Sequence, residues 1–201
     1  MTPLQTAATY DKIAEYWDHP GFDLSNGIAQ HHRALGFVST FGSALDVGCG
    51  SSGRIDALLL QQGFEVDALD LSSEMFRRAK LHNPDIRTYH ADICTWKLQR
   101  TYDFISAWDS IWHVPLGDQP RVIRKLCTGL STGGVLIFTS GGVYAPEEVI
   151  GTCCGQSLYH AAPGIPALFS VIEESGCLCR HFEFDAGPND KHVYFIAQRA
   201  E

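Results

Sequence analysis

A strand, a glycine-rich turn and a helix follow one another early in this chain, and they constrain its fold more than any other feature. Residues 44–47 form an apolar run typical of a buried strand, and residues 55–60 are typical of a helix. Between them lie Gly48, Gly50 and Gly53, in a G-x-G-x-x-G spacing. Glycine permits a sharp turn and the close approach of a ligand, and a helix N-terminus offers unpaired N–H donors. The stretch therefore predicts a cradle of the nucleotide-binding kind, although glycines that serve only the turn remain the alternative.

Asp46 narrows the choice of ligand, because it ends the strand directly before the glycines. Its charge would oppose a pyrophosphate but suits a ligand with an ammonium group, a ribose and no phosphate. S-adenosylmethionine is such a ligand. The run Asp46-Val47-Gly48-Cys49-Gly50 resembles the first motif of the class I S-adenosylmethionine-dependent methyltransferases. The resemblance implies an α/β, Rossmann-like fold: a seven-stranded, mostly parallel sheet with a C-terminal antiparallel hairpin and helices on both faces.

The composition suits a single globular domain. The chain has 201 residues, of which 45% are hydrophobic and 19% charged. Its net charge of −8 argues against nucleic-acid binding, and no apolar run is long enough to span a membrane. Residues 1–5 do not resemble a secretory signal, so we expect the seven cysteines to be reduced in the cytoplasm. We expect a monomer or homodimer acting on a small molecule.

Two helices are expected before the first strand, over residues 6–18 and 27–41, so residues 1–42 are predicted to form a helical cap on a domain at 43–201. The first helix resembles the entry helix of small-molecule methyltransferases. The resemblance implies that Tyr10 and Trp17 help to form the acceptor pocket. The alternative is that these aromatic side chains only hold the helix against the body.

Asp70 ends the second expected strand, about twenty residues beyond the glycines, where an acid holds both ribose hydroxyls in such folds. A role as helix N-cap is the alternative, but Ser72 already supplies that chemistry. The methyltransferase resemblance then places Leu71 and Met75 on either side of the adenine.

A short third strand leads into a stretch that resembles the adenine motif of the family. Asp92 would accept a hydrogen bond from the adenine amine, and the N–H of Ile93 would donate to a ring nitrogen. The predicted cofactor-binding residues are Asp46, Gly48, Cys49, Gly50, Arg54, Asp70, Leu71, Met75, Ala91, Asp92, Ile93 and Trp108.

A fourth strand over residues 101–108 points to the candidate catalytic residues. His113 and Asp109 follow it, where the resemblance places the transferred methyl group. His113 is the first candidate for a general base, because histidine titrates near neutral pH, and Asp109 is the second. The alternative is that His113 only braces the loop.

Residues 141–166 lose periodicity, and we expect a lid over the acceptor. Tyr144, Tyr159 and His160 are its candidate contacts, and a plain insertion with one short helix is the alternative. Cys153 and Cys154 are expected to be ordinary thiols, with a redox or acceptor-handling role as the alternative. Strands over 177–185 and 191–198, joined by a turn at 188–190, would close the sheet.

The predicted function is methyl transfer from S-adenosylmethionine to a small-molecule acceptor by in-line displacement. No metal is expected, because the carboxylates are not clustered. Two alternatives remain: a nicotinamide-dinucleotide oxidoreductase, which Asp46 and the chain length oppose, and a non-catalytic cofactor-binding regulator with the same fold.

Overall fold

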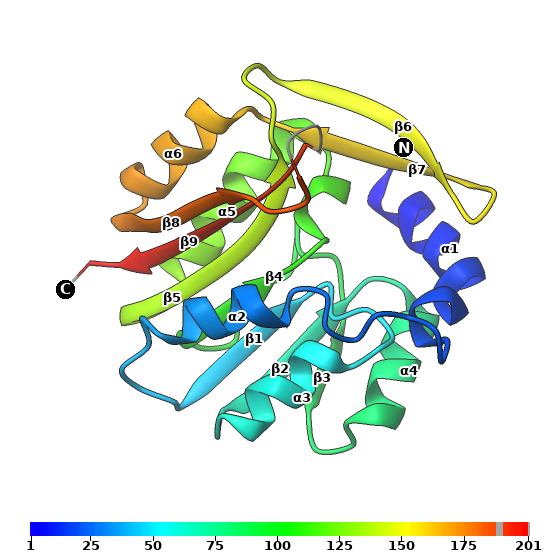
Figure 1. Ribbon diagram of the computed structural model, residues 1–201, viewed down its shortest axis with the longest axis horizontal. Helices are drawn as coiled ribbons and strands as arrows, with labels where there is room; N and C mark the ends of the chain where they lie inside the picture. The colour runs from blue at the N-terminus through cyan, green and yellow to red at the C-terminus, as the bar shows by residue number, and fades with distance from the viewer. Residues whose placement is uncertain (188–190, 201) are drawn as a thin grey trace.

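The computed structural model describes residues 1–187 and 191–200, so the turn expected at 188–190 lies outside the described residues. A seven-stranded sheet with the order β3-β2-β1-β4-β5-β9-β8 forms its centre (Figure 1). The strands are β1 (Ser43–Val47), β2 (Glu65–Asp70), β3 (Arg87–His90), β4 (Tyr102–Ala107), β5 (Leu130–Gly141), β8 (Cys177–Phe184) and β9 (His192–Arg199). Strands β1 to β5 are parallel, and β9 is antiparallel to β5 and β8. The predicted sheet with its C-terminal antiparallel hairpin is confirmed.

The strand order reverses between β1 and β4. From β1 the chain moves outward to β2 and β3, then crosses back to add β4 and β5 on the other side of β1. The loops that leave β1 and β4 therefore diverge at the carboxyl ends of the strands. Ligands of open α/β sheets bind in the crevice that such a reversal creates.

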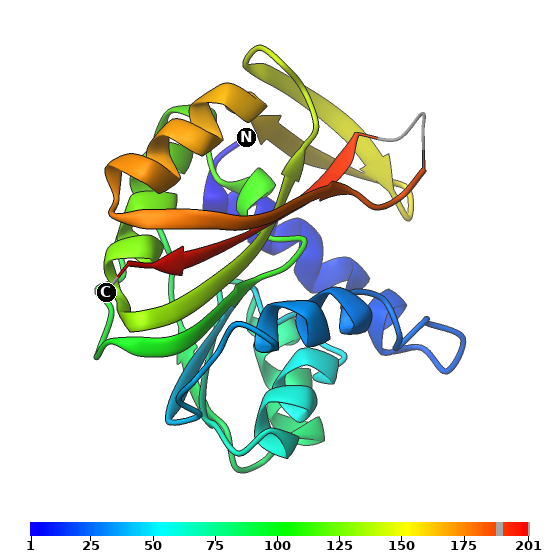
Figure 2. The same ribbon diagram turned by 60° about the vertical axis from the view of Figure 1, so that its left-hand side comes forward.

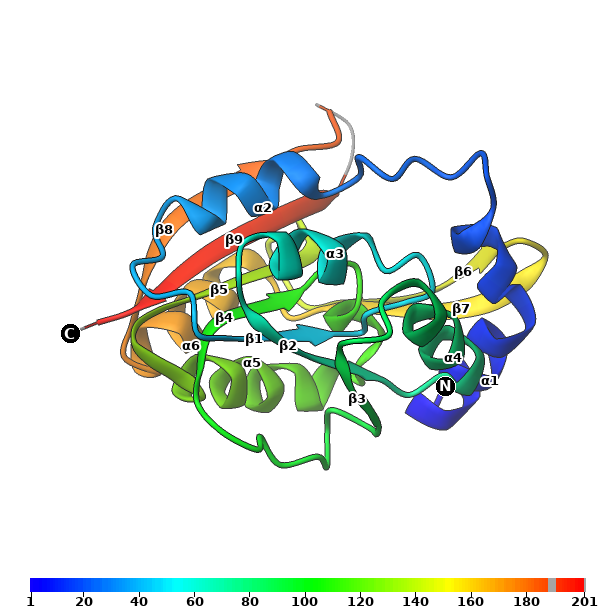
Figure 3. The same ribbon diagram turned by 90° about the horizontal axis from the view of Figure 1, so that it is seen from below.

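Helices cover both faces of the sheet (Figure 3). Alternate side chains of one strand face opposite sides, so Phe104 packs in a core with α2 and α3, whereas Ile105 packs in a core with α5 and α6. The helices are α2 (Ile28–Leu35), α3 (Arg54–Gln61), α4 (Ser73–His82), α5 (Gln119–Thr128) and α6 (Ile165–Glu174), with short 3₁₀ turns η2 (Ile111–His113) and η3 (Leu116–Asp118). None of the helices in the described ranges is long and apolar enough to cross a bilayer.

The N-terminal helices differ from their expected bounds. Helix α1 (Pro3–Ile13) begins at a capping box formed by Thr2 and Gln5, and continues as the 3₁₀ turn η1 (Ala14–Asp18). Helix α2 ends at Leu35, six residues before its expected end, and the N–H of Gly36 still donates to the carbonyls of His32 and Arg33. The Asp11 carboxylate accepts hydrogen bonds from Ser72 Oγ at 2.7 Å and Glu74 N at 2.9 Å, which fixes α1 to the start of α4.

The segment expected to be irregular forms a β-hairpin instead. Strands β6 (Glu147–Cys153) and β7 (Gln156–Ala162) pair in a separate two-stranded sheet beside α1 and η2 (Figures 1 and 2). Its turn places Cys154 at φ 49° and Gly155 at φ 72°. Two consecutive residues with positive φ match the twist of a tight two-residue hairpin turn. Asparagine is the residue that usually occupies the first of these positions, so the sequence did not predict the turn. The alternative of a plain insertion with one short helix is wrong.

Candidate functional site

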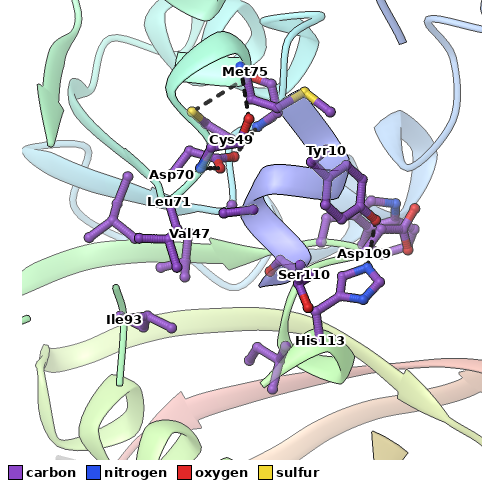
Figure 4. Close-up of a pocket in the computed structure, with 18 of the residues that line it drawn as sticks. Tyr10, Val47, Cys49, Asp70, Leu71, Met75, Ile93, Asp109, Ser110 and His113 are labelled. Carbon is purple, nitrogen blue, oxygen red and sulfur yellow. Dashed lines mark hydrogen bonds between the residues drawn. The ribbon is translucent and has the colours of Figure 1, made fainter. Parts of the chain in front are cut away.

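A cavity of about 330 Å³ opens at the carboxyl ends of β1, β2 and β4. The glycine turn and the β2–α4 connection form one side, and α1, η2 and the β6–β7 hairpin form the other. Figure 4 shows Asp70, Leu71 and Ile93 on the first side and Tyr10, Asp109 and His113 on the second. We call these sides the strand side and the cap side.

The glycine turn serves two different purposes. Gly48 and Gly50 both have positive φ, at 74° and 65°. A Cβ on Gly48 would lie 2.4 Å from Ser110 Cβ, so this glycine lets the loop after β4 pack closely. A Cβ on Gly50 would meet no atom within 4 Å and would project into open space. The bare backbone at Gly50 is therefore the part of the cradle that a ligand can approach.

Two carboxylates on the strand side are held in place by backbone N–H groups. Asp70 accepts from Gly50 N at 3.0 Å with one oxygen and from Ser72 N at 2.8 Å with the other. Asp92 accepts from Cys94 N at 2.8 Å. A carboxylate offers about four acceptor positions, so both retain capacity for a ligand hydroxyl or amine. Burial raises the pKa of Asp70.

Asp46 lies beneath the turn, with only 3% of its surface exposed. Burial raises its pKa to about 7, although the positive charge of Arg54 opposes the rise. Burial and the nearby Asp46 also hold the pKa of Asp56 well above its ordinary value. Asp46 is therefore part of a buried pair of carboxyl groups and not a lone charge at the strand end.

A histidine from α2 continues this buried polar cluster. His31 Nδ1 donates to the carbonyl of Gly27 at 2.7 Å, and Nε2 lies 3.0 Å from Ser106 Oγ. Burial lowers the pKa of His31 to about 4, so the ring is neutral and Nε2 accepts from the Ser106 hydroxyl. This cluster ties α2 to β4 directly behind the cavity.

Arg54 supplies the positive charge near the cavity, and its guanidinium is already hydrogen-bonded to other groups of the protein. Its Nε donates to the carbonyl of Asn26 at 2.9 Å, and Nη1 donates to Ser52 Oγ at 2.9 Å. The guanidinium carbon also lies 5.3 Å from the centre of the Phe22 ring. Arg54 therefore fastens the connection before α2 over the glycine turn.

His113 joins three elements on the cap side. Its Nδ1 donates to the carbonyl of Tyr159 in β7 at 2.7 Å. Its Nε2 lies 2.6 Å from the Tyr10 hydroxyl and 3.0 Å from Trp112 Nε1. An indole nitrogen only donates, so Nε2 is an acceptor and the ring is neutral. Burial also lowers the pKa of His113 to about 4.

Asp109 stands between the two sides in an unusual backbone conformation, at φ 52°. Its N–H donates to Thr139 Oγ1 at 2.8 Å, and its Oδ1 lies 3.0 Å from His192 Nε2. The other nitrogen of His192 contacts Asp185. Burial alone would lower the pKa of His192, but its hydrogen bonds to the two carboxylates raise it to about 9. His192 is therefore protonated at neutral pH and places a positive charge beside the Asp109 carboxylate.

Comparison with known proteins agrees with this geometry. Residues 22–147 match the family model described as methyltransferase domain. The ubiquinone biosynthesis O-methyltransferase of Idiomarina loihiensis is 25% identical over 166 residues, which cover 72% of this chain and 67% of that protein. The trans-aconitate 2-methyltransferase of an Enterobacter species is 30% identical over 142 residues, which cover 66% of this chain and 55% of that protein.

The chain belongs to the methyltransferase domain family. Among solved structures, an S-adenosylmethionine-dependent methyltransferase from Clostridium acetobutylicum superposes with a TM-score of 0.72 at 16% identity, covering 96% of this chain and 99% of that one. A sugar N-methyltransferase from a Streptoalloteichus species gives 0.71 at 18% identity, covering 92% of each. The predicted family and its cofactor, S-adenosylmethionine, are confirmed, and the dinucleotide oxidoreductase is left without support.

Most of the predicted site residues of this methyltransferase line the cavity described above. All twelve predicted cofactor residues do so, as do Asp109, His113, Tyr10, Trp17 and His160. Two predicted acceptor contacts are wrong. Tyr144 is 85% exposed on the outer surface. Tyr159 turns its ring away from the cavity, where its hydroxyl accepts from Leu116 N at 3.0 Å and donates to Glu148.

The sequence interpretation missed several residues of the methyltransferase cavity. Ser110 and Trp112 lie between Asp109 and His113, so those two predicted residues could have suggested them. Leu158 reaches the cavity only because the hairpin folds back over it, and so does Cys153, for which an acceptor-handling role was the alternative. Pro3, Thr6 and Ala7 of α1 line it as well.

Proposed function

We propose that this methyltransferase binds S-adenosylmethionine along the strand side of the cavity and holds a small-molecule acceptor on the cap side. The observation that carries the proposal is the open backbone at Gly50, whose N–H is held by Asp70. A bare cradle beside a carboxylate at the end of β2 fits a ribose with no phosphate.

Each residue has a role in this proposal. Asp70 accepts from the ribose hydroxyls, and Asp92 accepts from the adenine amine. Leu71, Met75 and Ile93 enclose the adenine, since all three line the same side of the cavity. When bound, the cofactor supplies a methyl group activated by its positively charged sulfur.

The residues of the cap side orient the acceptor and exclude water. Tyr10 from α1, Trp112 from η2 and His160 from β7 close over the cavity. Orientation and removal of water supply much of the rate when the leaving group is good. We assign His113 as a positioning residue that fixes Tyr10, and Asp109 as the charged group nearest the acceptor.

The remaining assignments of this proposal concern the whole protein. Residues 1–42 act as a cap on the domain at 43–201, with a lid at 141–166. The protein works as a monomer or homodimer in the cytoplasm and binds no nucleic acid, in keeping with its net charge of −8. The chain spans only 55% to 67% of the two relatives named above, so their acceptors are not transferred to it.

Calorimetric titration with S-adenosylhomocysteine, the demethylated product, tests the proposal. We expect a saturable isotherm with one site, and none with NADH. Binding of NADH without binding of S-adenosylhomocysteine would refute it. Cofactor binding with no methylated product from any acceptor class would instead support a non-catalytic regulator.

A further inference from the structure

The balance of charge around the cavity restricts what the acceptor can be. Within the described residues that line it, Arg54 is the sole lysine or arginine, and its guanidinium is bound to Asn26 and Ser52. Four carboxyl groups line the same cavity: Asp46, Asp70, Asp92 and Asp109. An acceptor that carries a carboxylate or phosphate would find only this guanidinium as a cationic partner, and its Nε and Nη1 are already engaged.

Aromatic rings form most of the wall on the cap side. The ring centres of Tyr10 and Trp17 lie 5.3 Å apart, and those of Trp112 and His160 lie 6.1 Å apart. Faces of tyrosine and tryptophan attract cations and also pack against apolar groups. The cap side therefore favours a ligand with an apolar body and a partial or full positive charge.

Asp109 gives this end of the cavity its charge. Among the described residues, the carboxylates of Asp109 and Asp185 flank the protonated His192 and outnumber its positive charge. The Asp109 side chain is 32% exposed, so a ligand in the cavity can reach it. Figure 4 shows Asp109 beside Tyr10 on the cap side.

His113 is not available as a free base for an acceptor that must first lose a proton. Both nitrogens of His113 are engaged, by Tyr159 on one side and by Tyr10 and Trp112 on the other. An alcohol or phenol becomes a good nucleophile only when its proton is removed. A neutral amine already carries a lone pair.

From these four observations we propose that the acceptor is an amine, bound between the aromatic wall and Asp109. The inference rests on the proposed methyltransferase function. An ammonium group bound at Asp109 first gives one proton to that carboxylate or to water. The freed lone pair then attacks the methyl carbon, so that a C–N bond forms as the C–S bond breaks and the positive charge passes from sulfur to nitrogen. Carboxylates stabilise the charge on either atom, whereas an anionic acceptor would neutralise it and lose that stabilisation.

A binding experiment separates this inference from the proposed function. The protein is saturated with S-adenosylhomocysteine and titrated with phenethylamine, 2-phenylethanol and 3-phenylpropanoate, which share one ring and differ in the polar group. We expect the amine to bind at least tenfold more tightly than the alcohol, and the carboxylate to bind more weakly than both. Failure of S-adenosylhomocysteine to bind would count against the proposed function, whereas an alcohol or carboxylate that binds as tightly as the amine overturns only the inference.

Asp109→Asn tests the assigned residue. Asparagine tolerates positive φ, so the backbone conformation at this position is kept. We expect the preference for the amine to fall at least tenfold while affinity for S-adenosylhomocysteine is unchanged. Asp118→Asn, which removes the same charge from η3 on the surface, is the matched control and should keep the preference. An unchanged preference in Asp109→Asn overturns the inference.

Tyramine provides a test of the reaction, because it carries both an amine and a phenol. With S-adenosylmethionine present, mass spectrometry should find the added methyl group on nitrogen. Methylation on the phenol oxygen overturns the inference. So does the absence of product from tyramine and phenethylamine in a protein that binds S-adenosylhomocysteine.

Discussion

The two sides of the cavity are built in different ways. The strand side comes from short contiguous stretches, in which a strand, a turn and the next helix follow one another, as at β1, Gly48–Gly53 and α3. The cap side joins α1, η2 and β7, which are far apart in the chain, through single side chains such as His113. In the proposed function, a cofactor shared by a whole family is thus held by local backbone geometry, whereas the acceptor is held by contacts between distant elements that can vary independently.

The largest loss of cofactor affinity should come from a side chain placed in the open space at Gly50. Gly50→Val places a side chain in the open space at φ 65°, and we expect affinity for S-adenosylhomocysteine to fall about 100-fold or more, equivalent to roughly 3 kcal/mol. Gly63→Val is the matched control, since Gly63 also has positive φ and open space but lies outside the cavity. The control should lower thermal stability and keep calorimetric affinity. Equal losses of affinity in both variants would show that backbone strain, not the cradle, was responsible.

Removing the Asp70 carboxylate should cause the next largest loss of cofactor affinity. Asp70→Asn should weaken S-adenosylhomocysteine binding by about 1.5–3 kcal/mol, the usual value of a hydrogen bond to a charged group. Asp103 is a matched control, because it accepts from Gly42 N at 3.1 Å and Ser43 N at 3.0 Å at the opposite end of the strands. Asp103→Asn should leave the isotherm unchanged. Wild-type affinity in Asp70→Asn would remove the ribose role.

The contrast between the two sides also explains what could be predicted from the sequence. The glycine spacing, Asp70 and Asp92 were identified correctly as cavity residues, because each lies at or just beyond the end of a strand and parallel strands end at one edge. The hairpin was missed because Cys154 occupies a turn position at which asparagine is the usual residue. Alternation along β7 then decides that His160 faces the cavity and Tyr159 does not, and that register was invisible without the strand.

A buried histidine on the cap side should make stability depend on pH. The pKa of His113 is lowered to about 4, so in the unfolded chain this residue takes up a proton that the folded state excludes. Its contribution is fully present above about pH 6.5 and is lost as the pH falls towards 4. In His113→Gln the slope of unfolding free energy against pH over that range should be shallower by up to about 1.4 kcal/mol per pH unit. Urea unfolding at several pH values measures it, and an identical slope would mean that His113 is protonated in the folded state.

The control for the pH experiment is the same substitution at His19, which is exposed in the connection before α2. His113→Gln and His19→Gln each remove one histidine ring and replace it with the same uncharged side chain. Only the first removes a buried ring, so a change in slope that appears equally in both variants would not report on the cap side.

The substitution with the smallest expected effect should show most directly that the two sides of the cavity bind different ligands. Tyr10→Phe removes the hydroxyl that donates to His113 Nε2 but keeps the ring in the wall of the cavity. The hydroxyl holds the Tyr10 ring in place, so KM for an amine acceptor should rise, by no more than about fivefold, since one neutral hydrogen bond is worth about 1 kcal/mol. The calorimetric Kd for S-adenosylhomocysteine should not change, because the strand side keeps all of its contacts. Tyr16→Phe, at an exposed neighbour on η1, controls for loss of a hydroxyl and should alter neither value. If Tyr10→Phe weakened cofactor and acceptor to the same extent, α1 would hold both ligands and the two sides would be one site in energetic terms.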